Sequence, residues 1–100
     1  MKLTKEEKRV ALSLKDYVLR DFPNNIDKLD WYIISISQDL SEEFIEKYKD
    51  KLDWNCISIY QKLSEEFIEK YKNKVSWYYI SKHQKLSDNF IEKYRNYLNK

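Results

Sequence analysis

The sequence predicts an all-α protein, a small α-solenoid of three 23-residue helical-hairpin repeats with an N-terminal capping helix. The segment LDWNCISIYQKLSEEFIEKY, residues 52–71, has a similar copy before it at residues 29–48 and another after it at residues 75–94. Trp31, Trp54 and Trp77 therefore stand 23 residues apart. A fixed period of this length is typical of stacked helical repeats. The chain of 100 residues also has no glycine and one proline, which favours helices joined by polar turns over glycine-dependent β-hairpins. One compact domain is expected.

The N-terminal segment, residues 1–27, lies outside the repeat and is predicted to form a capping helix and a turn. Thr4 and Glu7 fit a capping box, in which each side chain bonds the other residue's backbone N–H group. Apolar residues at helical spacing follow, and Pro23 ends the pattern. We therefore predict a helix over residues 4–22 that covers the first repeat, with the three repeats filling residues 28–100.

The first helix of each repeat is predicted to begin at the Trp, directly after an N-cap at Asp30, Asp53 or Ser76. Trp, Ile, Ser and Gln then recur at positions i, i+3, i+4 and i+7, which form one stripe of an α-helix. The Trp and Ile belong to the core. Because polar groups on a core stripe need partners, we expect the Ser and Gln side chains to bond a neighbouring repeat. These polar residues are Ser35, Ser58, Ser81, Gln38, Gln61 and Gln84.

The second helix of each repeat is predicted to start after an N-cap serine and to run for about 12 residues, with acidic residues first and basic residues last. In the first repeat its buried stripe is Phe44, Ile45, Tyr48 and Leu52. Pairs of the type Glu43–Lys47 would stabilise its exposed side, and Glu66–Lys70 is the equivalent pair. Helices of about 8 and 12 residues are too short to be stable alone, so stacking must supply a shared core.

The residues that change between repeats lie on the side of the first helix away from the Trp stripe. They are rich in Tyr and Ile, although Lys and Glu would serve solubility better, and such residues on an outer face are typical of a protein-binding surface. Drift on a tolerant surface is the competing interpretation. The predicted partner-binding residues, called the ridge below, are Tyr32, Ile33, Ile36, Asn55, Ile59, Tyr60, Tyr78, Tyr79, Lys82 and His83.

Charge changes along the array. Residues 28–50 hold three basic and six acidic side chains, residues 51–73 hold four of each, and residues 74–96 hold five basic and two acidic side chains. Basic residues among aromatics can bind phosphates and stack on bases, so the alternative is a nucleic-acid-binding module or an acidic partner. Its contacts would be Lys82, Lys85 and Arg95. The same polarity could instead steer an oppositely charged protein or align head-to-tail neighbours in a self-assembling structural repeat.

The end of the third repeat is predicted to be uncovered. Leu98 stands at the place of Leu52, so no repeat follows the last helix, and Phe90, Tyr94, Tyr97 and Leu98 should lack cover. Terminal repeats usually present a polar outer face. An apolar end is therefore a candidate contact, and a homodimer through Tyr94, Tyr97 and Leu98 is one expectation.

No reaction is predicted, and the protein is expected to be non-enzymatic, without cofactor or metal. Cys56 and His83 are the only obvious nucleophile and base; both occupy changing positions expected at the surface, and no oxyanion loop accompanies them. A single His lacks a second ligand at metal-binding spacing. One cysteine, no signal peptide and no membrane-spanning apolar run lead us to expect a cytoplasmic protein without a membrane partner.

The pattern L-D-W-x-x-I-S-x-x-Q-x-L-S-E-E-F-I-E-K-Y, over about residues 28–98, resembles a short two-helix tandem repeat. That repeat occurs in proteins of phages, large DNA viruses and mobile elements of AT-rich bacteria, mostly of unassigned function. Ser76 and Asp88-Asn89 depart from it and affect only capping and surface charge. The resemblance implies a phage or viral protein of the host cytoplasm that binds and inhibits a host protein. CRISPR nucleases and other defence complexes are the implied partners, which makes the chain an anti-CRISPR candidate.

Overall fold

The structure is a computed structural model and describes residues 4–13, 29–36 and 39–98. Most of its helices have a side-chain N-cap. Before the second helix of each unit, a serine Oγ accepts the N–H of the phenylalanine three positions later, at 3.0–3.2 Å. Asp30 and Asp53 cap the first helices of two units in the same way. Ser76 makes no side-chain cap bond. The predicted N-caps are therefore confirmed except at Ser76.

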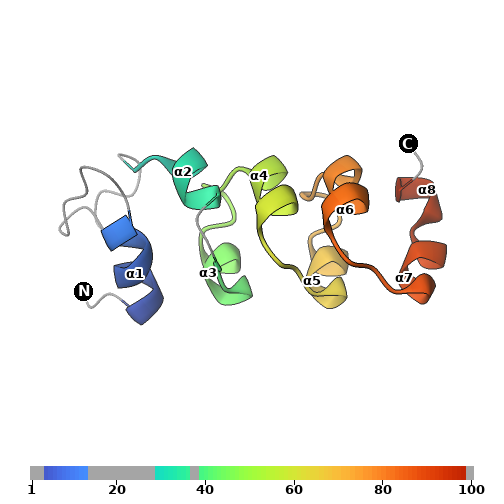
Figure 1. The fold of residues 1–100 in the computed structure, drawn as a ribbon, viewed down its shortest axis with the longest axis horizontal. Coiled ribbons are helices and arrows are strands. Elements are labelled where there is room, and N and C mark those ends of the chain that lie inside the picture. Colours follow the sequence, from blue (N-terminus) through green and yellow to red (C-terminus); the bar gives the residue numbers. More distant parts are fainter. Residues whose placement is uncertain (1–3, 14–28, 37–38, 99–100) are drawn as a thin grey trace.

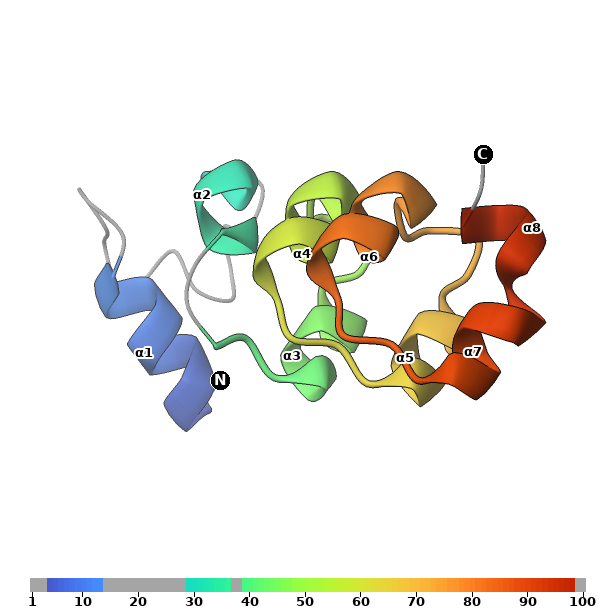
Figure 2. The same ribbon diagram turned by 45° about the vertical axis from the view of Figure 1, so that its right-hand side comes forward.

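The described residues contain helices and no strand, which confirms the all-α prediction. The elements are α1 (Lys5–Ser13), α2 (Trp31–Ser35), α3 (Glu42–Lys47), α4 (Trp54–Tyr60), α5 (Glu65–Lys70), α6 (Trp77–His83), α7 (Asp88–Lys93) and α8 (Arg95–Leu98). Figures 1 and 2 both show α2, α4, α6 and α8 in one row and α3, α5 and α7 in a second row. Helix α1 lies beside α3 at the N-terminal end.

The rows give the molecule an elongated outline of 46 × 20 × 19 Å. Helix α4 packs between α2 and α6, and α8 packs on α6 and α7. Completely buried isoleucines from both rows belong to one hydrophobic core. The Trp side chains lie at the margin of this core and are half-buried; the indole N–H of Trp54 donates to the Lys49 carbonyl, and that of Trp77 to the Lys72 carbonyl. The buried isoleucines are Ile34, Ile45, Ile57, Ile68 and Ile80.

The second helices are shorter than predicted. Each of α3, α5 and α7 has six residues, because Tyr48, Tyr71 and Tyr94 end them and the chain then turns. In the first unit the Leu52 N–H bonds the Tyr48 carbonyl across this turn, so Leu52 still reaches the core. The predicted buried stripe is therefore correct in the first unit although the helix is half as long, whereas in the third unit Ile91 is exposed and Leu98 is half-buried.

The capping box at the N-terminus is confirmed. The Thr4 N–H donates to Glu7 Oε1 at 2.9 Å, and the Glu7 N–H donates to Thr4 Oγ1 at 3.0 Å. Helix α1 ends at Ser13, and the remainder of the helix predicted over residues 4–22 lies outside the described residues. In the part of the chain that is described, no helix combines the length and the apolar character that crossing a membrane requires.

Candidate functional site

The serines of the core stripe hold the row α2, α4 and α6 together. Ser35 Oγ accepts the backbone N–H of Asp53 at 2.8 Å, and Ser58 Oγ accepts that of Ser76 at 3.0 Å. Both serines are completely buried. Each of these two hydroxyls therefore joins one unit to the start of the next first helix, as predicted. The prediction is wrong for Ser81, which is exposed and donates to the Tyr78 carbonyl of its own helix.

The glutamines make the complementary bond in the reverse direction. Gln61 Nε2 donates to the Ser35 carbonyl at 3.1 Å, while its Oε1 accepts the Leu40 N–H at 3.0 Å. Gln84 repeats this arrangement with the Ser58 carbonyl and the Leu63 N–H. One amide side chain thus satisfies two backbone groups of the preceding unit. The predicted role of these glutamines is confirmed, and Gln38 lies outside the described residues.

Glutamates join the second row, and here the prediction of pairs within one helix is wrong. Lys70 Nζ contacts Glu46 Oε1 of the preceding unit at 2.6 Å, and the Tyr71 hydroxyl donates to the same oxygen at 2.8 Å. Lys47 likewise contacts Glu7 rather than Glu43. Because each lysine lies close to a glutamate on the neighbouring helix, an inter-helix pair replaces the expected i,i+4 pair. Sequence alone held a signal, since both Glu46 and Tyr71 recur in each unit.

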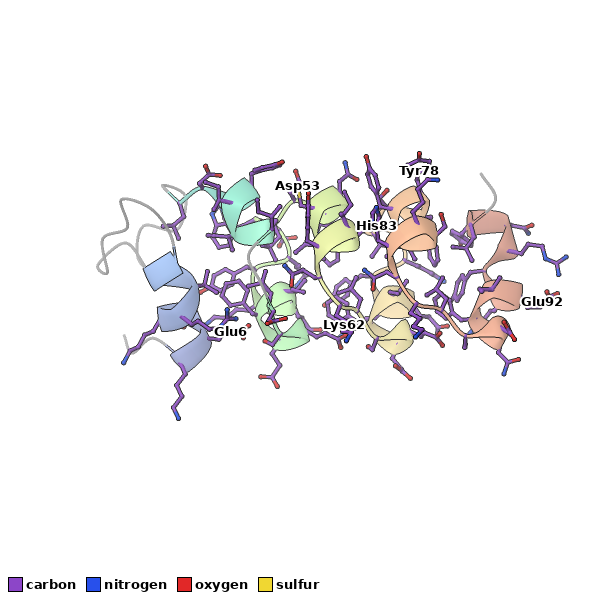
Figure 3. All side chains as sticks on the ribbon, viewed as in Figure 1. Glu6, Asp53, Lys62, Tyr78, His83 and Glu92 are labelled. Atoms are coloured by element: carbon purple, nitrogen blue, oxygen red, sulfur yellow. The ribbon has the colours of Figure 1, made fainter. Side chains whose placement is uncertain are left out.

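Helix α1 supplies the same chemistry to the first unit. Glu6 accepts the Ser41 N–H at 2.6 Å, and Glu7 accepts from Lys47 Nζ and from the Tyr48 hydroxyl. Figure 3 shows Glu6 on the side of α1 that faces α3. Burial raises the pKa of Glu7, but bonds from Lys47, Thr4 and Tyr48 outweigh it and lower the pKa to about 2. Burial and the Glu7 carboxylate raise the pKa of the Tyr48 hydroxyl.

This framework presents the ridge along α2, α4 and α6. Tyr32, Tyr60 and Tyr78 are the most exposed large apolar side chains, at 58%, 58% and 56%. Tyr78 projects outward from α6 in Figure 3. The other ridge residues range from exposed (Ile33, Asn55, Lys82, His83) to half-buried (Ile36, Ile59, Tyr79). Their placement at the surface agrees with the prediction, and partner binding by them stays a prediction.

On α6, the side chains of the ridge contact one another. The Tyr78 and Tyr79 rings meet edge to face at 5.1 Å, and Lys82 Nζ lies 4.9 Å from the centre of the Tyr78 ring. Tyr79 also contacts the His83 ring at 6.2 Å between centroids. Aromatic and cationic side chains that support one another in this way lose little rotamer entropy when a partner binds.

Cys56 differs from its predicted surface position. Its side chain is buried, with 6% exposure. The residues at the same place in the other units are more accessible, since Ile33 is exposed and Tyr79 is half-buried. Burial raises the pKa of the Cys56 thiol, and Asp53 raises it further. A buried thiol with a raised pKa is a poor nucleophile. Cys56 therefore belongs to the packing of α4, and the ridge is interrupted there.

The basic residues predicted to contact nucleic acid, Lys82, Lys85 and Arg95, lie on different segments and do not form one cluster. Lys82 lies over the Tyr78 ring on α6, whereas Arg95 pairs with Glu92 on the last two helices. Figure 3 shows Glu92 at the end of the molecule and His83 at α6. Lys85 is exposed in the segment between α6 and α7. Nucleic-acid binding by these residues stays a prediction.

The C-terminal end is partly different from its prediction. Phe90 and Tyr94, expected to lack cover, are 6% and 5% exposed. Trp77 stacks on both rings, so the third unit buries them by itself. Tyr97 is 40% exposed and contacts Trp77, and Leu98 is half-buried. Self-association through Tyr94 is therefore not supported by exposure. Sequence reasoning missed Ile91, which is 44% exposed, although its equivalents Ile45 and Ile68 are buried.

Among the described residues, no group of His, Cys, Asp and Glu side chains has an arrangement that could hold a metal ion. Comparison with known proteins gives no match to a family model, to a curated protein or to a solved structure. The geometry of the described residues and the sequence resemblance are therefore the basis for the function proposed below.

Proposed function

We propose that the protein is a non-enzymatic α-solenoid that binds another protein through the ridge on α2, α4 and α6. The solenoid arrangement is supported by bonds between units that recur at a fixed sequence separation for each type. This separation is 18 residues for Ser, 26 for Gln and 24 for Glu–Lys. Each unit bonds its neighbour through equivalent atoms. Such nearest-neighbour stacking is how short helical repeats become stable together.

The observation that carries the binding proposal is that one tyrosine on each of the three first helices stays exposed, while Ser35, Ser58 and the core isoleucines are buried. Tyr32, Tyr60 and Tyr78 come from three successive first helices, all held in one row. Tyrosine buries a large area at low entropic cost and is enriched at the centres of protein interfaces. Most of the charged residues of the chain lie elsewhere, so a partner can cover the ridge without stranding many charges.

The partner class follows from the resemblance described above, which implies a host protein such as a CRISPR nuclease or another defence complex. An elongated row of helices offers a long surface that suits a protein partner better than a small molecule. We propose that the protein acts by occupying such a surface, with no reaction of its own.

The test uses the tagged chain to capture proteins from the native host cytoplasm, with identification of what is retained. The double variant Tyr60→Ser, Tyr78→Ser should lose at least about tenfold in affinity for the retained partner, because interface tyrosines contribute about 2 kcal/mol each. The control variant Glu43→Ala, Glu66→Ala changes two exposed side chains of the second row and should bind normally.

Equal capture by both variants would contradict the ridge proposal. Nucleic-acid binding predicts a different result: capture should survive the tyrosine changes, weaken steeply with salt, and disappear with Lys82→Glu, Lys85→Glu. Treating the host extract with nuclease before capture separates these outcomes. Binding that resists both nuclease and moderate salt supports the protein partner.

A further inference from the structure

Five residues of the third unit are less covered than their equivalents in the earlier units. Ser35 and Ser58 are completely buried, and Ser81 is exposed. Ile45 and Ile68 are completely buried, and Ile91 is 44% exposed. The same contrast separates Leu86 and Leu98 from their buried equivalents, and Gln84 from the buried Gln61. These five residues together line one cavity of about 250 Å³: Ser81, Gln84, Leu86, Ile91 and Leu98.

The polar groups at this cavity are those that bond the next unit elsewhere in the molecule. Ser35 and Ser58 each accept a backbone N–H from the following unit, and Ser81 is the third member of that series. The N–H groups of Leu40 and Leu63 each donate to a glutamine of the following unit. Among the described residues, no group accepts the equivalent N–H of Leu86.

The acidic residues show the same difference: those of the first two units bond the following unit, and those of the third unit do not within the described ranges. Glu42 and Glu65 each accept the N–H and hydroxyl of the next serine, at 2.6–3.0 Å. Their equivalent, Asp88, pairs with no side chain in the described part of the chain. Glu46 and Glu69 each bind a Lys and a Tyr of the next unit, whereas Glu92 pairs with Arg95 of its own unit. Acceptors and cavity thus form one half of an interface that occurs twice inside the protein.

We propose that this C-terminal face binds a helical hairpin of the same repeat type, supplied by a partner protein. An amide side chain would fit the Ser81 carbonyl and the Leu86 N–H, and a branched aliphatic side chain would fit the cavity. A Lys–Tyr pair would replace Arg95 on Glu92. The amide bonds and the Lys–Tyr pair recur at the internal interfaces, so the face continues their bonding pattern. This site is separate from the ridge and goes beyond the function proposed above.

A second intact copy of the chain does not offer a free edge of this kind. In the first unit, α1 already occupies the position of a preceding second helix, with Glu6 on Ser41 and Glu7 on Lys47 and Tyr48. A copy would have to release α1 before its first unit could dock. A partner protein whose first hairpin is uncovered can dock without releasing a capping helix, so a partner hairpin fits this face better than a second copy.

The probe is a synthetic peptide with the sequence of residues 51–73, KLDWNCISIYQKLSEEFIEKYKN. Titrated into the ¹⁵N-labelled full chain under reducing conditions, it should shift the amide resonances of Ser81, Leu86 and Ile91, with the Leu86 amide moving downfield. The peptide should gain helicity as it docks. A peptide with Gln61→Glu has the same shape without the amide donor, and it should bind at least about tenfold more weakly.

Two variants of the protein make the result specific. Ile91→Asp places a charge in the cavity and should abolish binding, whereas Ile91→Val should retain it. The Tyr60→Ser, Tyr78→Ser variant should bind the peptide normally, so failure of the ridge and failure of this site are distinguishable. No shifts at millimolar peptide, or shifts confined to α1 and α3, would overturn the proposal. Shifts of the same amides with protein concentration alone would identify a second copy as the occupant and would also overturn it.

Discussion

Glu7 is a charged side chain with 2% exposure, and its surroundings explain why it stays ionised. A buried carboxylate is costly unless hydrogen bonds replace its hydration. Here the Lys47 ammonium, the Tyr48 hydroxyl and the Thr4 N–H supply those bonds. The bonded carboxylate therefore fixes α1 against the first unit, and the fixation depends on charge.

Acid should weaken this attachment. The pKa of Glu7 is lowered from 4.5 to about 2, so its stabilising contribution is complete above pH 4.5 and is lost as the pH falls toward 2. We expect the wild-type free energy of unfolding to fall over this range more steeply than that of Glu7→Gln. At pH 7 the variant should be less stable by about 2 kcal/mol, the usual loss for a bond to a charged group. Urea unfolding followed by Trp fluorescence measures both effects.

The control for this experiment is Glu46→Gln. Glu46 makes equivalent bonds to Lys70 and Tyr71, but its side chain is 45% exposed. Water therefore replaces much of what the substitution removes, and the pH dependence should change less than for Glu7→Gln. If the unfolding free energies of the two variants depended on pH in the same way, burial of Glu7 would make no contribution to the pH dependence of stability.

Short helices in this protein depend on their caps, since six- or seven-residue helices have little stability of their own. Sequence predicted the beginnings of these helices well, because Ser and Asp caps leave a local signal in the residue order. It predicted their ends poorly. No glycine marks the end of α3, α5 or α7, and the chain turns there because the tyrosine after each helix bonds a neighbouring helix. That contact is tertiary and has no local signal.

A difference between two caps can be measured directly. Asp53 Oδ1 accepts the Cys56 N–H at 3.1 Å, whereas Ser76 makes no cap bond at the equivalent place. Asp53→Ala should cost about 1 kcal/mol of unfolding free energy, and Ser76→Ala should cost much less. The variant Ser76→Asp should stabilise the protein by up to about 1 kcal/mol, because it restores the missing cap. Equal losses for Asp53→Ala and Ser76→Ala, by thermal or urea unfolding, would contradict this explanation.

At the scale of the whole molecule, the covered and uncovered isoleucines show where stacking contributes. Ile68 is completely buried and Ile91 is 44% exposed, although both occupy the same place in their units. We expect Ile68→Ala to cost about 2–5 kcal/mol and Ile91→Ala about 1 kcal/mol or less. Similar losses would mean that the next unit does not cover this position, which would contradict the proposed stacking. Chemical denaturation of the two variants makes the comparison.

Recurring residues in the sequence were enough to predict the buried isoleucines and the bonds that Ser and Gln make between the units. They did not show that the tryptophans are only half-buried or that Ser81 is exposed. They were not enough to separate a pair within a helix from a pair between helices, because Glu43–Lys47 and Glu46–Lys70 fit the same charge pattern. The burial of Cys56, and of Phe90 and Tyr94, also depends on neighbours that periodicity does not specify. Sequence periodicity thus predicts the helix face on which a residue lies more readily than the residues it contacts.

The contacts between units have an evolutionary consequence. Every recurring bond joins residues no more than 26 positions apart, so none spans beyond the adjacent unit. An in-frame duplication of one unit inside the array would leave both of its edges matched to their neighbours. Such a duplication would lengthen the row of first helices by one unit and keep the bonds between units, while α1 would still pack on the first unit.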